Sequence, residues 1–164
     1  MNKSLLVIFC IVFAQNLFCQ NLKINDDGIY EAQLILNIDS TSKDVLFSKA
    51  LSWLAIDYRS ANDVIQQQDK EIGKIIAKGI YLPLGDGFAW QAIGVRHMLI
   101  IEVKDNKIRL TINPMTYTLK DVDYRTLNTS FAGKKKILEL TEIKVQESLT
   151  SFSDYMYKKI KSDW

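Results

Sequence analysis

His97 is the only histidine in the chain, so it is the one side chain that ordinarily titrates near neutral pH. Its imidazole could act as a general base or as a pH switch. A Ser-His-Asp triad is not indicated, because the sequence has no nucleophile-elbow motif to mark the serine. We instead expect His97 at the start of a strand, on or near the edge of the core, and we assign no catalytic residue.

The acidic and glycine-containing segments do not match a metal or phosphate motif. Residues 26–28 (DDG) and 85–87 (GDG) lack the five or more spaced oxygen ligands of a calcium loop, and the latter lacks the third glycine and following helix of a phosphate loop. Residues 69–71 (DKE) could bind a cation or a partner, although a solvated turn explains them without a function. No two of the 19 acidic residues are marked as the carboxylate pair of a hydrolase. We therefore predict no metal and no cofactor.

Phe88 and Trp90 are the most suggestive candidates for binding. They lie in residues 82–95 (LPLGDGFAWQAIGV), whose proline and glycines predict a long hairpin loop. Exposed aromatic side chains on such a loop can contact a partner, or they can fold back over the edge of a sheet. Lys104 and Arg109, which the strand pattern places on the solvent side of a hairpin, complete the predicted binding residues.

Residues 1–19 have the pattern of a secretory signal peptide. Lys3 provides the positive charge, and residues 5–14 (LLVIFCIVFA) form an apolar run. As a helix, this run spans about 15 Å, roughly half of the hydrocarbon core of a bilayer. Cleavage after Cys19 would leave Gln20 as the N-terminus. The alternatives are a retained membrane anchor, a lipoprotein, for which the phenylalanine before each cysteine is a poor match, and a buried strand, which the lack of alternation disfavours.

Both cysteines lie within this leader, so the processed chain of 145 residues (164 less 19) has no thiol and no disulfide. We expect an exported protein, periplasmic or extracellular, with no membrane span after cleavage. The 21 basic and 19 acidic residues give a formal charge of +2, which provides no bulk attraction for nucleic acid. The 48% of hydrophobic residues is typical of a folded chain, so residues 20–164 are predicted to form one domain.

The hydrophobic periodicity predicts an α+β domain. Residues 29–38 alternate as a half-buried strand does, residues 42–59 repeat apolar side chains at helical spacing, and a second amphipathic helix is predicted at about 144–161. Four further strands are predicted at 63–68, 74–81, 97–104 and 107–113. The simplest arrangement is an antiparallel sheet of about five strands, in the order β-α-β-β-β-β-α, with both helices on one face. The sequence leaves open whether residues 114–143 extend the sheet.

Three stretches resemble a known family, namely residues 42–54 (SKDVLFSKALSWL), 60–79 (SANDVIQQQDKEIGKIIAKG) and 100–112 (IIEVKDNKIRLTI). Together they are similar to the domain of unknown function 4468, and the resemblance covers about residues 30–117. It implies a fold like that of the TATA-binding protein and an origin among exported proteins of Gram-negative bacteria. The family has no established activity, so the resemblance implies no catalytic residue.

The predicted open face of the sheet does not look like a DNA-binding surface. A TATA-binding protein inserts phenylalanine wedges and basic residues into DNA. The open face here carries a mixed set without aromatics, Glu31, Gln33, Ile35, Lys104 and Arg109, so we predict no nucleic-acid partner.

We expect a non-catalytic binding or interaction module of the cell envelope. It would contact an unknown envelope protein or ligand through the open sheet face and residues 82–95. The alternative is a small-molecule-binding or hydrolytic domain with a pocket between the sheet and the helices.

We expect N-terminal sequencing of protein isolated from the envelope to begin at Gln20, because signal peptidase cleaves after a small residue such as Cys19. A membrane-bound protein that still begins at Met1 would indicate a retained anchor instead. A lipid-modified cysteine at the N-terminus would indicate a lipoprotein.

Overall fold

The computed structural model of the chain describes residues 22–58, 64–82, 93–119, 122–130 and 133–158. Its helices and strands, in chain order, are β1 (Lys23–Ile24), β2 (Tyr30–Asn37), α2 (Lys43–Asp57), β3 (Ile65–Asp69), β4 (Lys74–Tyr81), β5 (Ile93–Lys104), β6 (Lys107–Leu119), β7 (Val122–Thr126) and α4 (Lys134–Tyr157). The leader expected at residues 1–19 and the aromatic pair Phe88 and Trp90 lie outside the described residues.

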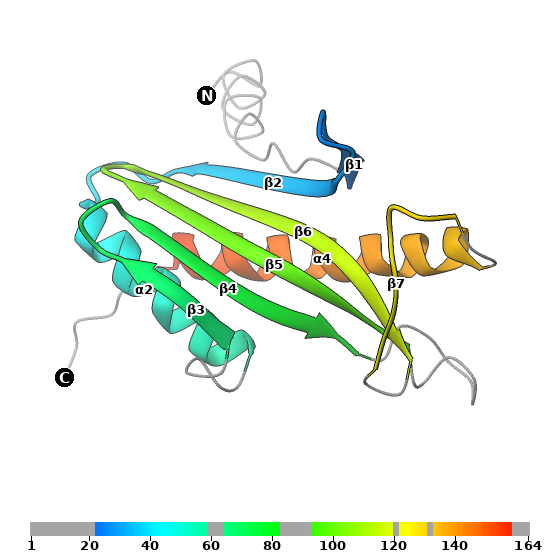
Figure 1. The fold of residues 1–164 in the computed structure, drawn as a ribbon. Coiled ribbons are helices and arrows are strands. Elements are labelled where there is room, and N and C mark those ends of the chain that lie inside the picture. Colours follow the sequence, from blue (N-terminus) through cyan, green and yellow to red (C-terminus); the bar gives the residue numbers. More distant parts are fainter. Residues whose placement is uncertain (1–21, 59–63, 83–92, 120–121, 131–132, 159–164) are drawn as a thin grey trace, which may run out of the picture.

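The strands form one antiparallel sheet in the order β1-β2-β6-β5-β4-β3, with β7 paired to the end of β6. Both helices lie on the same face of this sheet (Figure 1). The α+β class and the placement of the helices that the sequence predicts are therefore confirmed. In the described residues the sheet has seven strands rather than about five. The two-residue β1 is too short to show a periodic signal, and β7 falls within residues 114–143, which the sequence leaves open.

Helix α2 forms where the sequence pattern predicts it. Ser42 caps the helix, since its Oγ accepts a hydrogen bond from the Val45 N–H at 3.5 Å, and Asp44 places a negative charge in the first turn. The buried side chains are those of the predicted apolar stripe, Leu46, Phe47, Ala50, Trp53 and Leu54. Fully burying a side chain such as leucine or phenylalanine contributes about 1.5–3 kcal/mol, so this stripe holds the helix on the sheet.

Helix α4 starts at Lys134, well before the position of about 144 that the periodicity predicts, and it ends at Tyr157. The apolar pattern is interrupted by Thr141, a polar residue at a fully buried position. Its hydroxyl is satisfied within the helix, because Thr141 Oγ1 donates to the Ile137 carbonyl at 2.7 Å. The buried side chains that the pattern does predict are Val145, Leu149, Phe152 and Met156.

The β5–β6 hairpin is longer than the sequence predicts at both ends. β5 already begins at Ile93, and β6 continues beyond Asn113 to Leu119. The strands pass Pro114 because the register shifts there: His97 pairs with Pro114 while Arg96 pairs with Thr116, so one extra residue is taken up in a β-bulge. The inward faces are as predicted, with Leu99, Ile101, Val103, Ile108, Leu110 and Ile112 all buried.

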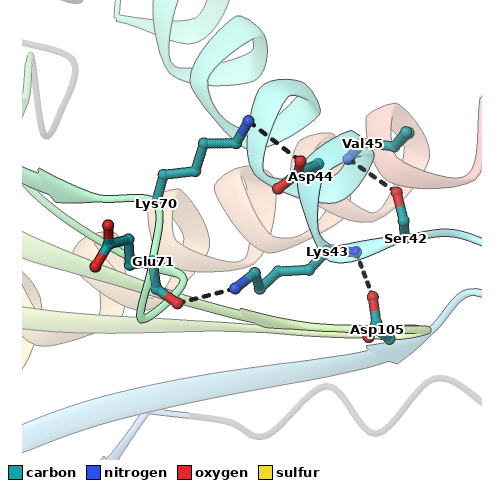
Figure 2. A network of polar contacts seen from close by, with 7 residues as sticks. All are labelled: Ser42, Lys43, Asp44, Val45, Lys70, Glu71 and Asp105. Carbon is teal, nitrogen blue, oxygen red and sulfur yellow. Dashed lines mark hydrogen bonds and ion pairs between the residues drawn. The ribbon is translucent and has the colours of Figure 1, made fainter.

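Three segments that are distant in sequence meet at the end of the sheet where α2 begins (Figure 2). Asp105, in the β5–β6 turn, accepts a hydrogen bond from the Lys43 N–H at 2.7 Å, which satisfies one of the free N–H groups of the helix N-terminus. Lys43 Nζ donates to the Glu71 carbonyl in the β3–β4 turn at 2.9 Å, and Lys70 pairs with Asp44 at 3.2 Å. Residues 69–71 therefore act as an exposed structural turn that holds the start of the helix.

Gly73 completes this junction because no other residue fits its position. Its φ is +70°, and a Cβ there would lie 2.3 Å from the Val103 carbonyl oxygen. The close approach of the two backbones allows the Val103 N–H to donate a hydrogen bond to the Gly73 carbonyl at 2.7 Å. The β3–β4 turn is thereby held against the end of β5.

Changing Asp105 to alanine should destabilise the fold by about 1 kcal/mol, because the first N–H of α2 loses its acceptor. The measurement is the free energy of unfolding in urea. Glu71→Ala is the matched control, since it removes a carboxylate of the same junction that makes no contact of its own there. We expect the control to change stability by less than about 0.5 kcal/mol. Equal losses in the two variants would show that Asp105 does not cap the helix.

Candidate functional site

A cleft opens beyond the end of α2, because this helix is shorter than the strands that it covers. Helix α2 has 15 residues and spans about 22 Å, whereas β5 has 12 residues and spans about 40 Å. Because α2 begins at one end of the sheet, it ends partway along the strands (Figure 1). A cleft of about 920 Å³ lies beyond that end, between the last residues of α2, strands β4 to β6 and the middle of α4.

Polar side chains from four elements converge on this cleft. Asp57 and Tyr58 come from the end of α2, and Ser148 and Ser151 come from one face of α4. The sheet contributes Tyr81 at the end of β4 and His97 in β5.

His97 forms the floor of the cleft. It lies inside β5 rather than at the start of a strand, and it is fully buried. Its ring stacks on the Tyr81 ring with centroids 3.9 Å apart and an angle of 19° between the planes. Its Nε2 lies 2.9 Å from the hydroxyl of Tyr58, and its Nδ1 lies 3.4 Å from the Val95 carbonyl oxygen.

Gly79 makes this arrangement possible, because it pairs directly with His97 across β4 and β5. Paired residues project to the same face of an antiparallel sheet, so the missing side chain leaves room for two rings. A Cβ at Gly79 would lie 2.6 Å from His97 Nε2 and 2.4 Å from Tyr58 Cε1. The glycine therefore positions Tyr58 over the strand.

The environment keeps His97 neutral. Burial lowers the pKa of its imidazole to about 4, and the bond to the Val95 carbonyl opposes this shift only in part. With its Nδ1 proton directed at that carbonyl, Nε2 is left to accept a hydrogen bond from the Tyr58 hydroxyl. The lone pair that a general base would use is thus engaged, and the geometry makes His97 a positioning residue for Tyr58.

The remaining polar groups form two short hydrogen-bond chains. The Tyr81 hydroxyl donates to Ser148 Oγ at 3.2 Å. The Ser151 hydroxyl donates to Asp57 Oδ1 at 3.0 Å and accepts from Trp53 Nε1 at 3.1 Å. Burial raises the pKa of Tyr81, and it also raises the pKa of Asp57, against the opposing effect of the Ser151 bond. These side chains thus present neutral hydroxyl groups and one partly desolvated carboxyl group to the cleft.

The sequence-predicted binding residues Lys104 and Arg109 lie elsewhere, on the face of the sheet that the helices leave open. Arg109 is bonded to Glu102, its cross-strand neighbour, through Nη2 and through Nε, the latter at 2.7 Å. Lys104 is exposed at the hairpin end of β5. The structure therefore brings Lys104 and Arg109 to one face, as predicted, but does not bring either of them to the cleft.

Sequence reasoning missed the cleft residues Tyr58, Gly79, Tyr81 and Ser148. Tyr58 and Tyr81 fall on apolar stripes, so the pattern assigns them to the core. The role of Gly79 can be recognised only from the β4–β5 register, which places it opposite His97. A register prediction for these two strands is the signal that could have found the site.

Two further observations concern chemistry and membrane contact. Within the described ranges, no three side chains of histidine, cysteine, aspartate or glutamate are grouped closely enough to hold a metal ion. Neither of the two described helices is both long and apolar enough to cross a bilayer.

Both the sequence and the fold match known proteins. The family model described as a domain of unknown function (DUF4468) with TBP-like fold matches residues 33–118. The structure is similar to a DUF4468 family protein from Bacteroides ovatus ATCC 8483, with a TM-score of 0.70 and 11% identity over 92% of this chain and 98% of that one. It is also similar to a TBP-like protein from Parabacteroides distasonis ATCC 8503, with a TM-score of 0.69 and 15% identity over 83% and 97% of the two chains. At these identities the likeness shows the fold alone. No curated protein matches the sequence.

The buried state of His97 predicts how stability depends on pH. The ordinary histidine pKa is 6.5 and the folded value is about 4, so between these values the unfolded chain binds a proton that the folded chain does not. The contribution of the neutral imidazole to the free energy of unfolding is fully present above pH 6.5. It is lost as the pH falls toward 4, by up to about 3 kcal/mol. Urea unfolding of the wild type should show this decrease in the free energy of unfolding with falling pH, and His97→Gln should lack it.

Because the chain has one histidine, its imidazole Cε1 proton can be assigned in an NMR spectrum without ambiguity. We expect this resonance to stay constant from pH 8 to about pH 5. A midpoint near the ordinary histidine value would show that the imidazole is exposed, and it would contradict the described site.

Proposed function

Since the chain belongs to the DUF4468 family, for which no activity is established, we propose from its geometry that it is a non-catalytic binding module. A polar molecule of a few hundred daltons occupies the cleft between the sheet and the helices. The observation that carries this proposal is the convergence of hydroxyl groups from α2, β4 and α4 on a cleft of about 920 Å³. Pockets for small molecules typically have volumes of about 300–1,000 Å³.

The chemistry of the lining indicates the kind of ligand. Tyr58, Tyr81 and Ser148 offer neutral hydroxyl groups, each of which can form a further hydrogen bond. On the rim, Lys144 Nζ is paired with Glu147 at 2.8 Å, so these two charges largely cancel. Lys78 and Arg96 also line the cleft, and their charge is opposite to that of Asp57. A lining with charges of both signs favours a polar ligand that carries both signs or is uncharged overall.

The proposal of binding without turnover rests on the role of His97. Its imidazole is fully buried, neutral and already bonded through Nε2 to Tyr58. It can hold the Tyr58 ring in place, but it presents no free lone pair to a bound molecule. A leader at residues 1–19, if it is removed as we expect, would place this module in the cell envelope or outside the cell.

Asp57 favours one second candidate, a hydrolytic activity. Its carboxyl group lines the cleft with a pKa raised by burial, which is a property of general acids. Glu147 lines the same cleft. Turnover of an ester, glycoside or peptide that disappears in Asp57→Asn would replace the binding proposal by this one.

The test is a native mass spectrum of the protein purified gently from its own cell envelope. We expect an extra mass of a few hundred daltons that is released on denaturation. Ser148→Leu fills the cleft with apolar volume and should abolish the adduct. Thr150→Leu, on the exposed side of α4, should retain it. A bare wild-type protein, or an adduct that persists in a folded Ser148→Leu variant, would contradict the proposal.

A further inference from the structure

The face of the sheet opposite the helices has an apolar centre. Ile76 pairs with Ile100 across β4 and β5, and Met98 is the next residue along β5 on the same face. All three side chains are partly buried. Toward β2 the apolar row is bounded by Thr111, a buried polar residue of β6 that pairs with Ile100. The centre of the face is therefore able to contact an apolar partner surface.

Basic side chains dominate the rest of this face. In strands β2 to β6, alternation places six basic and three acidic residues on it, which gives these strands a net formal charge of +3 on this face. The basic residues are Lys74, Lys78, Arg96, Lys104, Lys107 and Arg109, and the acidic ones are Glu31, Asp69 and Glu102. The whole chain carries a formal charge of only +2, so all its other residues together carry a formal charge of −1. The positive charge is thus a property of this face.

We propose that this face is an interaction surface for a protein whose own surface has an apolar centre and an acidic rim. Protein interfaces commonly combine an apolar core with a polar rim, and opposite potentials across the rim accelerate association. Lys104 and Lys107, at the hairpin end, provide rim charges outside the cleft. Lys78 and Arg96 also line the cleft, so the two binding surfaces adjoin along β4 and β5. The proposal goes beyond ligand binding in the cleft and does not depend on it.

Two other occupants fit the face less well. A second copy of the chain would bring two faces of like charge together, which is unfavourable. Nucleic acid is disfavoured because the described residues of the face include no aromatic side chain for base stacking. In addition, the Glu102 carboxylate accepts a hydrogen bond from the Arg109 guanidinium and places negative charge near the centre of the face.

The test uses site-specific photocrosslinking in cells that produce the full chain. A benzophenone amino acid replaces Gln67, an exposed residue of β3 that pairs with Ile76 on the open face. The same probe at Ile143, which is 54% exposed on α4, serves as the positional control. Crosslinked species are identified by mass spectrometry together with the sequence of the attached segment.

We expect the Gln67 probe to capture one protein through a segment rich in aspartate and glutamate, and the Ile143 probe not to capture it. The charge reversal K104E/K107E should reduce the yield at least tenfold. The matched reversal K135E/K136E, at exposed positions of α4, should leave it unchanged. Thermal unfolding must show both variants folded.

Four results would overturn the proposal. These are a crosslink to a second copy of the chain, a crosslink to nucleic acid, a yield that survives K104E/K107E, and the absence of any crosslink from the Gln67 probe. Because none of these readouts involves Ser148 or the bound mass in the cleft, failure here is distinguishable from failure of ligand binding.

Discussion

The hydrogen bond from the Lys43 N–H to Asp105 fixes where α2 lies on the sheet. It joins the first residue of the helix to the β5–β6 turn, and the Lys43 side chain extends the same junction to the β3–β4 turn. With its start held at one end of the sheet, a helix of 15 residues must end before the strands do. The cleft is the consequence, because its open side is the part of the sheet that α2 does not reach. The junction thus determines the position of the site without contributing a residue to it.

A second constraint shapes the floor of the cleft. Gly79 leaves a space on the helix side of β4, and the His97 ring and Tyr58 fill it. The ring is satisfied by the Val95 carbonyl and the Tyr58 hydroxyl, so a polar side chain can be buried at little cost. An apolar residue at position 97 could fill the same volume, but it would not orient the Tyr58 hydroxyl. The buried imidazole is therefore better explained by the site than by packing alone.

Most of the fold could be predicted from the sequence because apolar periodicity reports burial directly. The α2 stripe, the inward faces of β5 and β6 and the turn at 105–106 all follow from it. The early start of α4 could not be predicted, since Thr141 is buried with its hydroxyl bonded to the helix backbone and so resembles a solvent position in the pattern. The continuation of β6 past Pro114 depends on a bulge, which has no periodic signal.

The candidate site was largely hidden for a different reason. Tyr58, Gly79 and His97 are 39 residues apart at the extremes and are joined only by strand register and by the end of a helix. Single-sequence patterns report which side chains are buried, but not which of them meet. Lys104 and Arg109 were accessible to prediction because one hairpin alone determines the face on which they lie.

The openness of the cleft can be measured with two serines of α4. Ser148 and Ser153 are 7% and 5% exposed, but only Ser148 lines the cleft. With Cys10 and Cys19 replaced by serine, a cysteine introduced at either position is the only thiol of the chain. We predict that iodoacetamide labels Ser148→Cys at least tenfold faster than Ser153→Cys in the folded protein, with equal rates in denaturant. Equally slow labelling of the two folded variants would show that the cleft does not admit small molecules, which would contradict its role as a binding site.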